Sequence, residues 1–131
     1  MITTADLKKI AQGRLKDAEV LFAAGRYDGA IYLSGYVVEV ALKCRICETL
    51  KWSGFPQSNN EFKSYQSFKT HDLEVLLKLS GVEQEIKATN FAEWSAVTSW
   101  NPETRYTPIG QSSQPEAELM IEAVTILLEA L

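Results

Sequence analysis

The sequence predicts an all-α protein, an up-and-down four-helix bundle with a short additional helix. Three observations lead to this class. Residues 28–51 form the longest strongly apolar segment of the chain. Other segments repeat their apolar residues at intervals of three and four, which is the helical period, and none alternates as an amphipathic strand does. We therefore expect one domain over residues 1–131, with helices packed around the central apolar one.

The central segment reads DGAIYLSGYVVEVALKCRICETLK, and its apolar residues cover most of a helix surface. One narrow polar seam remains. It consists of Tyr32, Tyr36, Glu39 and Lys43, whose spacing of four, three and four places them on one helical face. The charged residues exclude a membrane span. We expect neighbouring helices to cover the other faces.

The first helix begins at a cap formed by Thr3 or Thr4 and ends at Gly25. Arg14 lies within its apolar stripe and Asp17 at the edge of that stripe. A charge on a buried face is costly unless it is paired. We expect Arg14 either to extend its guanidinium to water or to pair with a core carboxylate, for which Glu39 is the candidate.

Only three residues, 25–27, join the first helix to the second, and this predicts an antiparallel hairpin with Asp28 capping the second helix. Residues 53–60 read as a loop. Residues 61–70 could form a helical turn over the core or a partly ordered lid.

The later helices are expected over 73–80, with Thr70 as the cap, over 83–99, and from Ser113 onward. The prolines near residue 105 interrupt the helical pattern. The predicted core residues of these helices are Leu73, Leu76, Leu77, Leu79, Ile86, Phe91, Trp94, Val97, Leu119, Ile121, Val124, Leu127 and Leu128.

Few motifs in the chain carry chemistry by themselves. Cys44 and Cys47 form a CxxC, but they lie late in a helix and lack further zinc ligands, so we expect buried thiols. His71 is the only histidine, and at a helix start it could either hold a loop or serve a site. Arg105 and Tyr106 lie in the proline-bounded loop, where they could bind a partner or a phosphate, or cover the end of the bundle.

The net charge of −4 argues against binding of RNA or DNA without sequence preference, because such proteins present a basic face. The first residues lack the basic start and the apolar run of a secretory signal. The lack of such a signal, together with the presence of two cysteines, predicts a protein of the reducing cytoplasm.

Three sequence blocks together resemble the HEPN domain, the higher eukaryotes and prokaryotes nucleotide-binding domain. They are RLKDAE from Arg14, GRYDGAIYLSGYVVEVALK from Gly25 and THDL from Thr70, and Trp100 and Arg105-Tyr106 also fit. The resemblance implies a helical homodimer. It also implies a minimal nucleotidyltransferase as partner, commonly in a toxin–antitoxin pair, and binding of a nucleotide or of the transferase substrate.

Many HEPN proteins are metal-independent RNases in which a His follows an Arg after a few positions. No Arg in this chain has a His four to six residues later. We therefore expect a non-catalytic HEPN protein with no metal and no cofactor other than a nucleotide ligand such as ATP. The expected ligand-binding residues are Arg14, Asp17, Tyr32, Tyr36, Glu39, Lys43, His71, Arg105 and Tyr106.

Two alternatives remain open from the sequence. The first is an RNase with a divergent site around His71, Asp72 and Arg105. The second is a purely structural dimerisation module whose polar seam is a satisfied interface.

Overall fold

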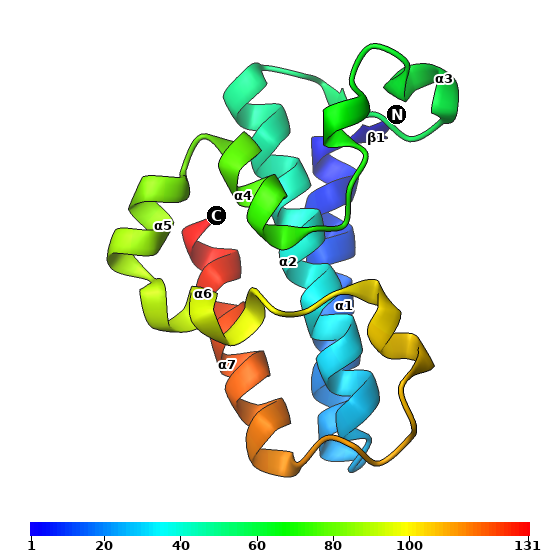
Figure 1. Ribbon diagram of the computed structural model, residues 1–131, viewed down its shortest axis with the longest axis vertical. Coiled ribbons are helices and arrows are strands. Elements are labelled where there is room, and N and C mark those ends of the chain that lie inside the picture. Colours follow the sequence, from blue (N-terminus) through cyan, green and yellow to red (C-terminus); the bar gives the residue numbers. More distant parts are fainter.

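Two long helices lie side by side at the centre of the computed structural model, which describes residues 1–131 (Figure 1). They are α1 (Thr4–Ala23) and α2 (Tyr27–Leu50), and α7 (Gln114–Ala130) packs against both. The short helices α4 (Leu73–Ser80), α5 (Glu83–Thr89) and α6 (Phe91–Val97) complete the bundle. The predicted all-α bundle is confirmed, with three long helices and a set of short ones in place of a fourth.

The α1–α2 hairpin forms as its short link predicts. Thr3 caps α1 by accepting a hydrogen bond from the Asp6 N–H at 3.2 Å. Gly25 turns the chain with a φ of 75°, a left-handed conformation that glycine adopts without strain.

The expectation for Asp28 is wrong, because α2 already begins at Tyr27 and has no side-chain cap. The Asp28 carboxylate instead accepts hydrogen bonds from the Gly110 N–H at 2.6 Å and the Ser112 N–H at 2.9 Å. These bonds tie the loop that precedes α7 to the start of α2. They also lower the pKa of Asp28, the bond from Gly110 having the largest effect.

Helix α2 is the core of the bundle. Its fully buried side chains face several directions and include Val37, Val38, Leu42, Ile46 and Cys47. A helix that is apolar on most sides must be wrapped by its neighbours, and the packing of α1, α4 and α7 against it confirms this expectation.

The segment after α2 is an ordered cover over the end of the core. A short ribbon pairs β1 (Ile2–Thr3) with β2 (Gly54–Phe55), and the helices α3 (Asn59–Phe62) and η1 (Gln66–Phe68) follow. Phe55 and Phe62 are buried with their ring centroids 6.0 Å apart. Of the two readings of residues 61–70, the structure therefore has helical turns over the core.

Helix α4 begins at a different cap from the expected one. Asp72 accepts hydrogen bonds from the backbone N–H groups of Glu74 and Val75, at 2.9 and 3.2 Å. Thr70 supports this turn by accepting one from the Asp72 N–H. Asp72 is the N-cap in place of Thr70 because its carboxylate reaches two free N–H groups of the first turn.

The helix predicted over residues 83–99 is two helices, because the backbone leaves the helical region at Asn90, with φ −125° and ψ 38°. Trp94 and Val97 are buried as expected, whereas Phe91 is 65% exposed and was wrongly assigned to the core. The break redirects α6 so that Trp94 and Val97 face inward and Phe91 faces water.

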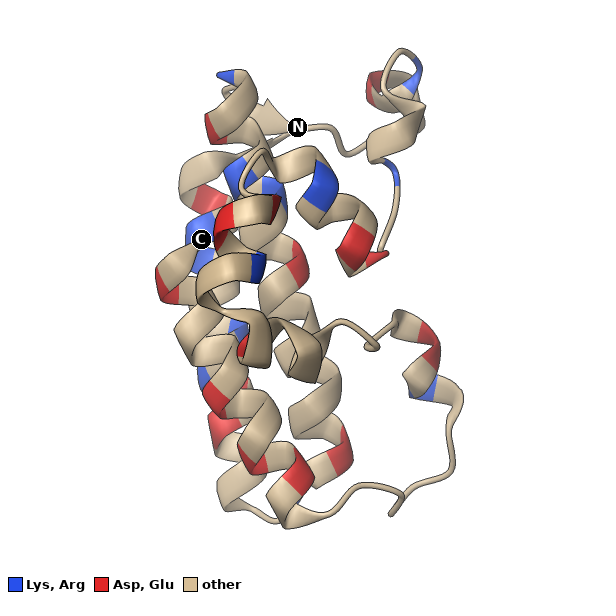
Figure 2. Cartoon of the chain, turned by 60° about the vertical axis from the view of Figure 1, so that its left-hand side comes forward, with Lys and Arg blue, Asp and Glu red and all other residues tan.

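A one-turn helix, η2 (Pro102–Tyr106), and an extended loop lead to α7, which Ser113 caps as predicted. Val124 and Leu127 are buried, but Leu119 is 59% exposed and was also wrongly assigned. The outer face of α7 carries acidic residues and no basic ones (Figure 2).

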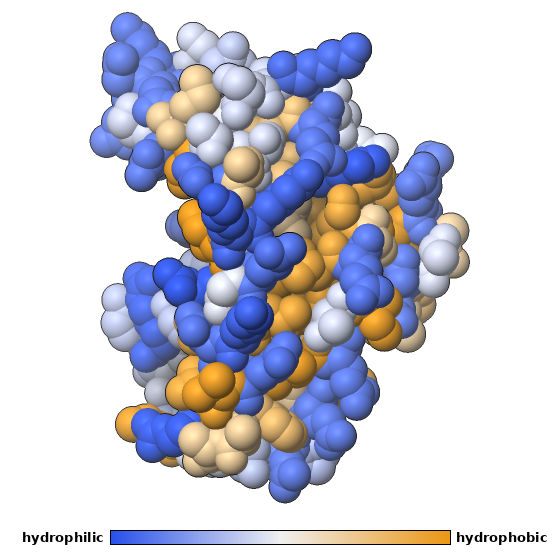
Figure 3. Space-filling model, turned by 180° about the vertical axis from the view of Figure 1, so that it is seen from behind, coloured by the Kyte–Doolittle hydropathy of each residue, from blue (hydrophilic) through white to orange (hydrophobic).

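Seen from behind the view of Figure 1, the molecule shows a band of apolar atoms bordered by polar side chains (Figure 3). A hollow of about 160 Å³ lies between α1, α2 and α7, and its apolar lining includes Ala11, Ala41, Leu128 and Leu131. None of the helices has both the length and the apolar character needed to cross a membrane.

Candidate functional site

The polar seam of α2 has the geometry that its spacing predicts. The hydroxyl oxygens of Tyr32 and Tyr36 lie 3.4 Å apart, and their rings meet edge to face with centroids 5.3 Å apart. One turn further on, Lys43 Nζ donates to Glu39 Oε2 at 2.9 Å. The four side chains therefore form one continuous row along an otherwise apolar helix.

Glu39 is the buried centre of this row, with 3% of its surface exposed. Its second oxygen, Oε1, lies 3.0 Å from Nδ1 of His71, which precedes α4. An isolated buried carboxylate would be costly, and here two basic side chains compensate it. The expected partner Arg14 is not one of them: it binds Asp17, three residues further along the exposed face of α1.

His71 is held at one nitrogen and open at the other. The contact with Glu39 orients Nδ1 toward the carboxylate, so Nδ1 carries the proton and Nε2 is left for another partner. The side chain is 62% exposed. A histidine arranged in this way can bind a ligand or transfer a proton.

A cleft of about 400 Å³ opens beside His71, between the start of α4 and the η2 segment. Asp72 and Arg105 also line it, and hydroxyl and amide side chains complete its polar wall. They are those of Thr98, Ser99 and Asn101. The cleft thus brings together residues that are more than thirty positions apart in the chain. It offers a ligand a negative group, Asp72, and a positive one, Arg105.

Trp100 forms the floor of this cleft and is 6% exposed. Its ring covers Gly35 of α2 so closely that a Cβ there would lie 2.0 Å from the ring atoms. Tyr36 packs edge-on against the same ring, with centroids 4.9 Å apart. The indole Nε1 is buried and has no hydrogen-bond partner. Close packing, and no hydrogen bond of the indole, therefore holds Trp100 against the middle of α2, two residues before η2 begins.

Arg105 extends from η2 next to the tyrosines. Its guanidinium carbon lies 4.8 Å from the ring centroid of Tyr106, and the side chains of Tyr106 and Tyr32 both raise its pKa. Burial, reinforced by the hydrogen bond with Tyr32, raises the pKa of Tyr36 to about 12. Tyr106 is 73% exposed and does not cover the bundle end.

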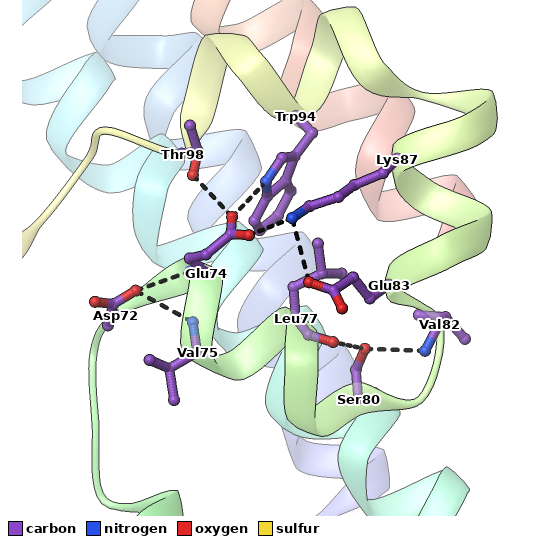
Figure 4. Close-up of polar contacts among 10 residues, drawn as sticks. All are labelled: Asp72, Glu74, Val75, Leu77, Ser80, Val82, Glu83, Lys87, Trp94 and Thr98. Carbon is purple, nitrogen blue, oxygen red and sulfur yellow. Dashed lines mark hydrogen bonds and ion pairs between the residues drawn. The ribbon is translucent and has the colours of Figure 1, made fainter.

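A second polar network borders the cleft on the side of α4 and contains Thr98 and Asp72 (Figure 4). Its centre is Glu74, which accepts hydrogen bonds from Trp94 Nε1 at 2.9 Å and Thr98 Oγ1 at 3.3 Å, and from Lys87. These donors, Lys87 first, lower the pKa of Glu74. The network joins α4 to α5 and α6.

Of the nine expected ligand-binding residues, the structure brings seven into one region. They are Tyr32, Tyr36, Glu39, Lys43, His71, Arg105 and Tyr106. Arg14 and Asp17 bind each other on α1, half exposed, and line neither this cleft nor any hollow near His71.

Sequence reasoning missed the positions of Trp100 and Gly35 in this site. A glycine in the middle of a buried helix was the available signal, because it weakens the helix unless something packs closely against it.

The two cysteines lie away from the cleft and are free and buried, as predicted. Burial is the main reason why the pKa of Cys47 rises to about 11, and it also raises that of Cys44. The structure contains no group of three His, Cys, Asp or Glu side chains able to hold a metal ion.

Comparison with known proteins gives one match, in the helices that carry the polar seam. Neither a curated protein nor a solved structure matches the chain. Residues 4–51, which form α1 and α2, match the family model described as HEPN domain. This match supports the family that the sequence motifs predicted, over the two helices that contain the motif blocks beginning at Arg14 and Gly25.

Proposed function

We propose that this HEPN protein pairs with a minimal nucleotidyltransferase and holds a nucleotide, or the acceptor substrate of the transferase, in the cleft beside His71. One observation carries the ligand half of the proposal. The polar seam of a buried helix meets the cleft where Arg105 and His71 converge. The family resemblance supports the partner half, together with the toxin–antitoxin role.

The cleft offers the groups that a nucleotide requires. Arg105 can bind a phosphate through several N–H donors, and the exposed ring of Tyr106 can stack on a base. Asp72 and Asn101 supply polar atoms for ribose hydroxyls. Tyr32 contacts Arg105, and Glu39 orients His71.

Calorimetric titration with ATP tests the ligand half. We expect saturable binding that Arg105→Ala and Lys43→Ala weaken. Arg14→Ala is the matched control, because it removes a cation that lies outside the cleft. Absence of ATP binding, alone and in the presence of the partner, would refute nucleotide binding.

Co-purification tests the partner half. The protein would be expressed with the nucleotidyltransferase encoded in the neighbouring reading frame, and a stable complex is the expected result. A neighbouring reading frame that encodes a protein of another class would contradict the pairing, and so would a nucleotidyltransferase that elutes separately. The free, buried cysteines favour a reducing compartment for both proteins, and we propose the cytoplasm.

A second candidate function is RNA cleavage, which one specific arrangement favours. His71, Asp72 and Arg105 line a single cleft, and Glu39 orients the histidine for proton transfer. Incubation of RNA with the wild type and with His71→Ala distinguishes this function from binding alone. Equal cleavage by both proteins, or no cleavage, excludes it.

The third candidate is a structural dimer. The apolar band on the face seen from behind supports self-association (Figure 3). We propose a homodimer whether or not the protein also binds a ligand. Light scattering after size exclusion measures the oligomeric state of the wild type, of Leu128→Lys in the hollow between α1, α2 and α7, and of Tyr36→Ala in the seam. A dimer that Tyr36→Ala disrupts, in a protein without a ligand, would favour the purely structural function.

A further inference from the structure

A second hollow, of about 460 Å³, shares His71 with the cleft as a lining residue. It is bounded by α2, by β2 and by the segment that leads from α3 to α4, which runs beside α2 (Figure 1). The polar side chains of its lining are those of Lys43, Gln57, Lys69, Thr70 and His71, and no Asp or Glu lines it. We refer to it as the basic hollow.

The charges around the basic hollow do not balance. Glu39 contributes one buried negative charge, and it faces both Lys43 and His71. Lys69 donates to the neutral amide oxygen of Asn59 at 2.7 Å and has no carboxylate partner. Two lysines therefore oppose one carboxylate, which leaves one positive charge in surplus.

The basic groups are also held in place before any ligand arrives. Lys43 Nζ lies 5.3 Å from the ring centroid of buried Phe55, and its side chain is only 17% exposed. The hydroxyl oxygen of Thr70 accepts a hydrogen bond from the Asp72 N–H, so its proton remains free to be donated. Donors that are fixed in advance lose little conformational entropy when an anion binds.

We propose that the basic hollow binds the terminal phosphates of a nucleotide whose base, ribose and first phosphate lie in the cleft. This inference rests on the proposed function and adds the orientation of the ligand. His71 lines both spaces, so a ligand that extends past it from one into the other would contact Arg105 at one end and Lys69 at the other. Phosphate oxygens would take the surplus positive charge that the protein itself leaves uncompensated.

The test compares ATP, adenosine and inorganic pyrophosphate as calorimetric ligands of the intact protein. Lys69→Gln should weaken the binding of ATP and of pyrophosphate about tenfold or more, because each ligand loses a charge-assisted hydrogen bond. The affinity for adenosine should not change. Lys63→Gln is the matched control, since Lys63 lies in the same segment but does not line the hollow. Thermal unfolding of each variant verifies that it is folded.

The outcomes separate this inference from the proposed function. ATP binding that Lys69→Gln leaves unchanged would overturn the basic hollow as the phosphate site while nucleotide binding stands. Pyrophosphate binding that depends on Lys69, in a protein that does not bind ATP, would support the hollow and refute the nucleotide. Failure of both ATP and pyrophosphate to bind would overturn both.

Discussion

Glu39 and Glu74 each accept hydrogen bonds from basic and neutral side chains of neighbouring elements, yet their surroundings differ. Glu74 is one-third exposed, and its donors Lys87, Trp94 and Thr98 occupy both carboxylate oxygens. Lys87 binds Glu83 as well, so one lysine pairs with two carboxylates and every polar group of Glu74 has a partner within the protein (Figure 4). Such a network joins helices and has nothing left for a ligand.

Glu39 is buried, and two basic side chains share its single charge. His71 lines two hollows. The two carboxylates therefore differ in what surrounds them: the partners of Glu74 join helices to one another, whereas a partner of Glu39 faces open space, which is the arrangement that our proposed function uses.

The largest expected effect comes from Glu39→Ala, which leaves Lys43 without its carboxylate in a largely buried position. We expect the free energy of unfolding to fall by about 3–5 kcal/mol, the cost of breaking a buried ion pair. Urea denaturation measures it. ATP binding should weaken as well, because His71 loses its orienting partner. A loss no greater than that of Glu74→Ala would end the distinction between the two carboxylates.

Gly35→Ala tests how the floor of the cleft is held. The added methyl group must displace the Trp100 ring, and we expect a loss of about 1–3 kcal/mol in the free energy of unfolding, with a change in tryptophan fluorescence. Gly13→Ala is the control, because nothing lies within 4 Å of its added Cβ, and it should stabilise α1. Stabilisation by both substitutions would show that Trp100 does not pack on Gly35.

Glu74→Ala should have a smaller effect. It removes the acceptor of the buried Trp94 indole, but Lys87 keeps its partner Glu83, so we expect a loss of about 1 kcal/mol. ATP binding should remain close to that of the wild type, which calorimetry can measure. A loss of binding as large as that of Glu39→Ala would show that this network belongs to the site.

Asp28→Asn should have the smallest effect, and one that depends on pH. Folding lowers the pKa of Asp28 below its ordinary value of 3.8, so its contribution to stability is present above that pH and disappears as the pH falls through the lowered pKa. The melting temperature of the wild type should exceed that of Asp28→Asn at pH 7, and the two should converge as the pH falls below 3.8. A difference that is constant with pH would contradict the role of the carboxylate.

Much of the fold and part of the site could be predicted from the sequence because they follow from the period of a helix. The row from Tyr32 to Lys43 is an example, since helical spacing alone determines which residues share a face. The core position of α2 followed in the same way from its apolar surface.

The partners of these residues could not be predicted, since they depend on tertiary packing. Nothing local distinguishes His71 from Arg14 as the partner of Glu39, and the choice is made by where the loop before α4 lies. The break at Asn90 was hidden for a similar reason: no proline or glycine marks it, and burial of Trp94 redirects the chain.

The central position of α2 also has a consequence during synthesis on the ribosome. α2 is complete at residue 50, but α7, one of the helices that cover it, is complete only at residue 130. At the usual speed of translation this interval of about 80 residues lasts roughly 4–16 s. For that time the newly made hairpin exposes an uncovered apolar surface, to which a chaperone or a second nascent chain can bind.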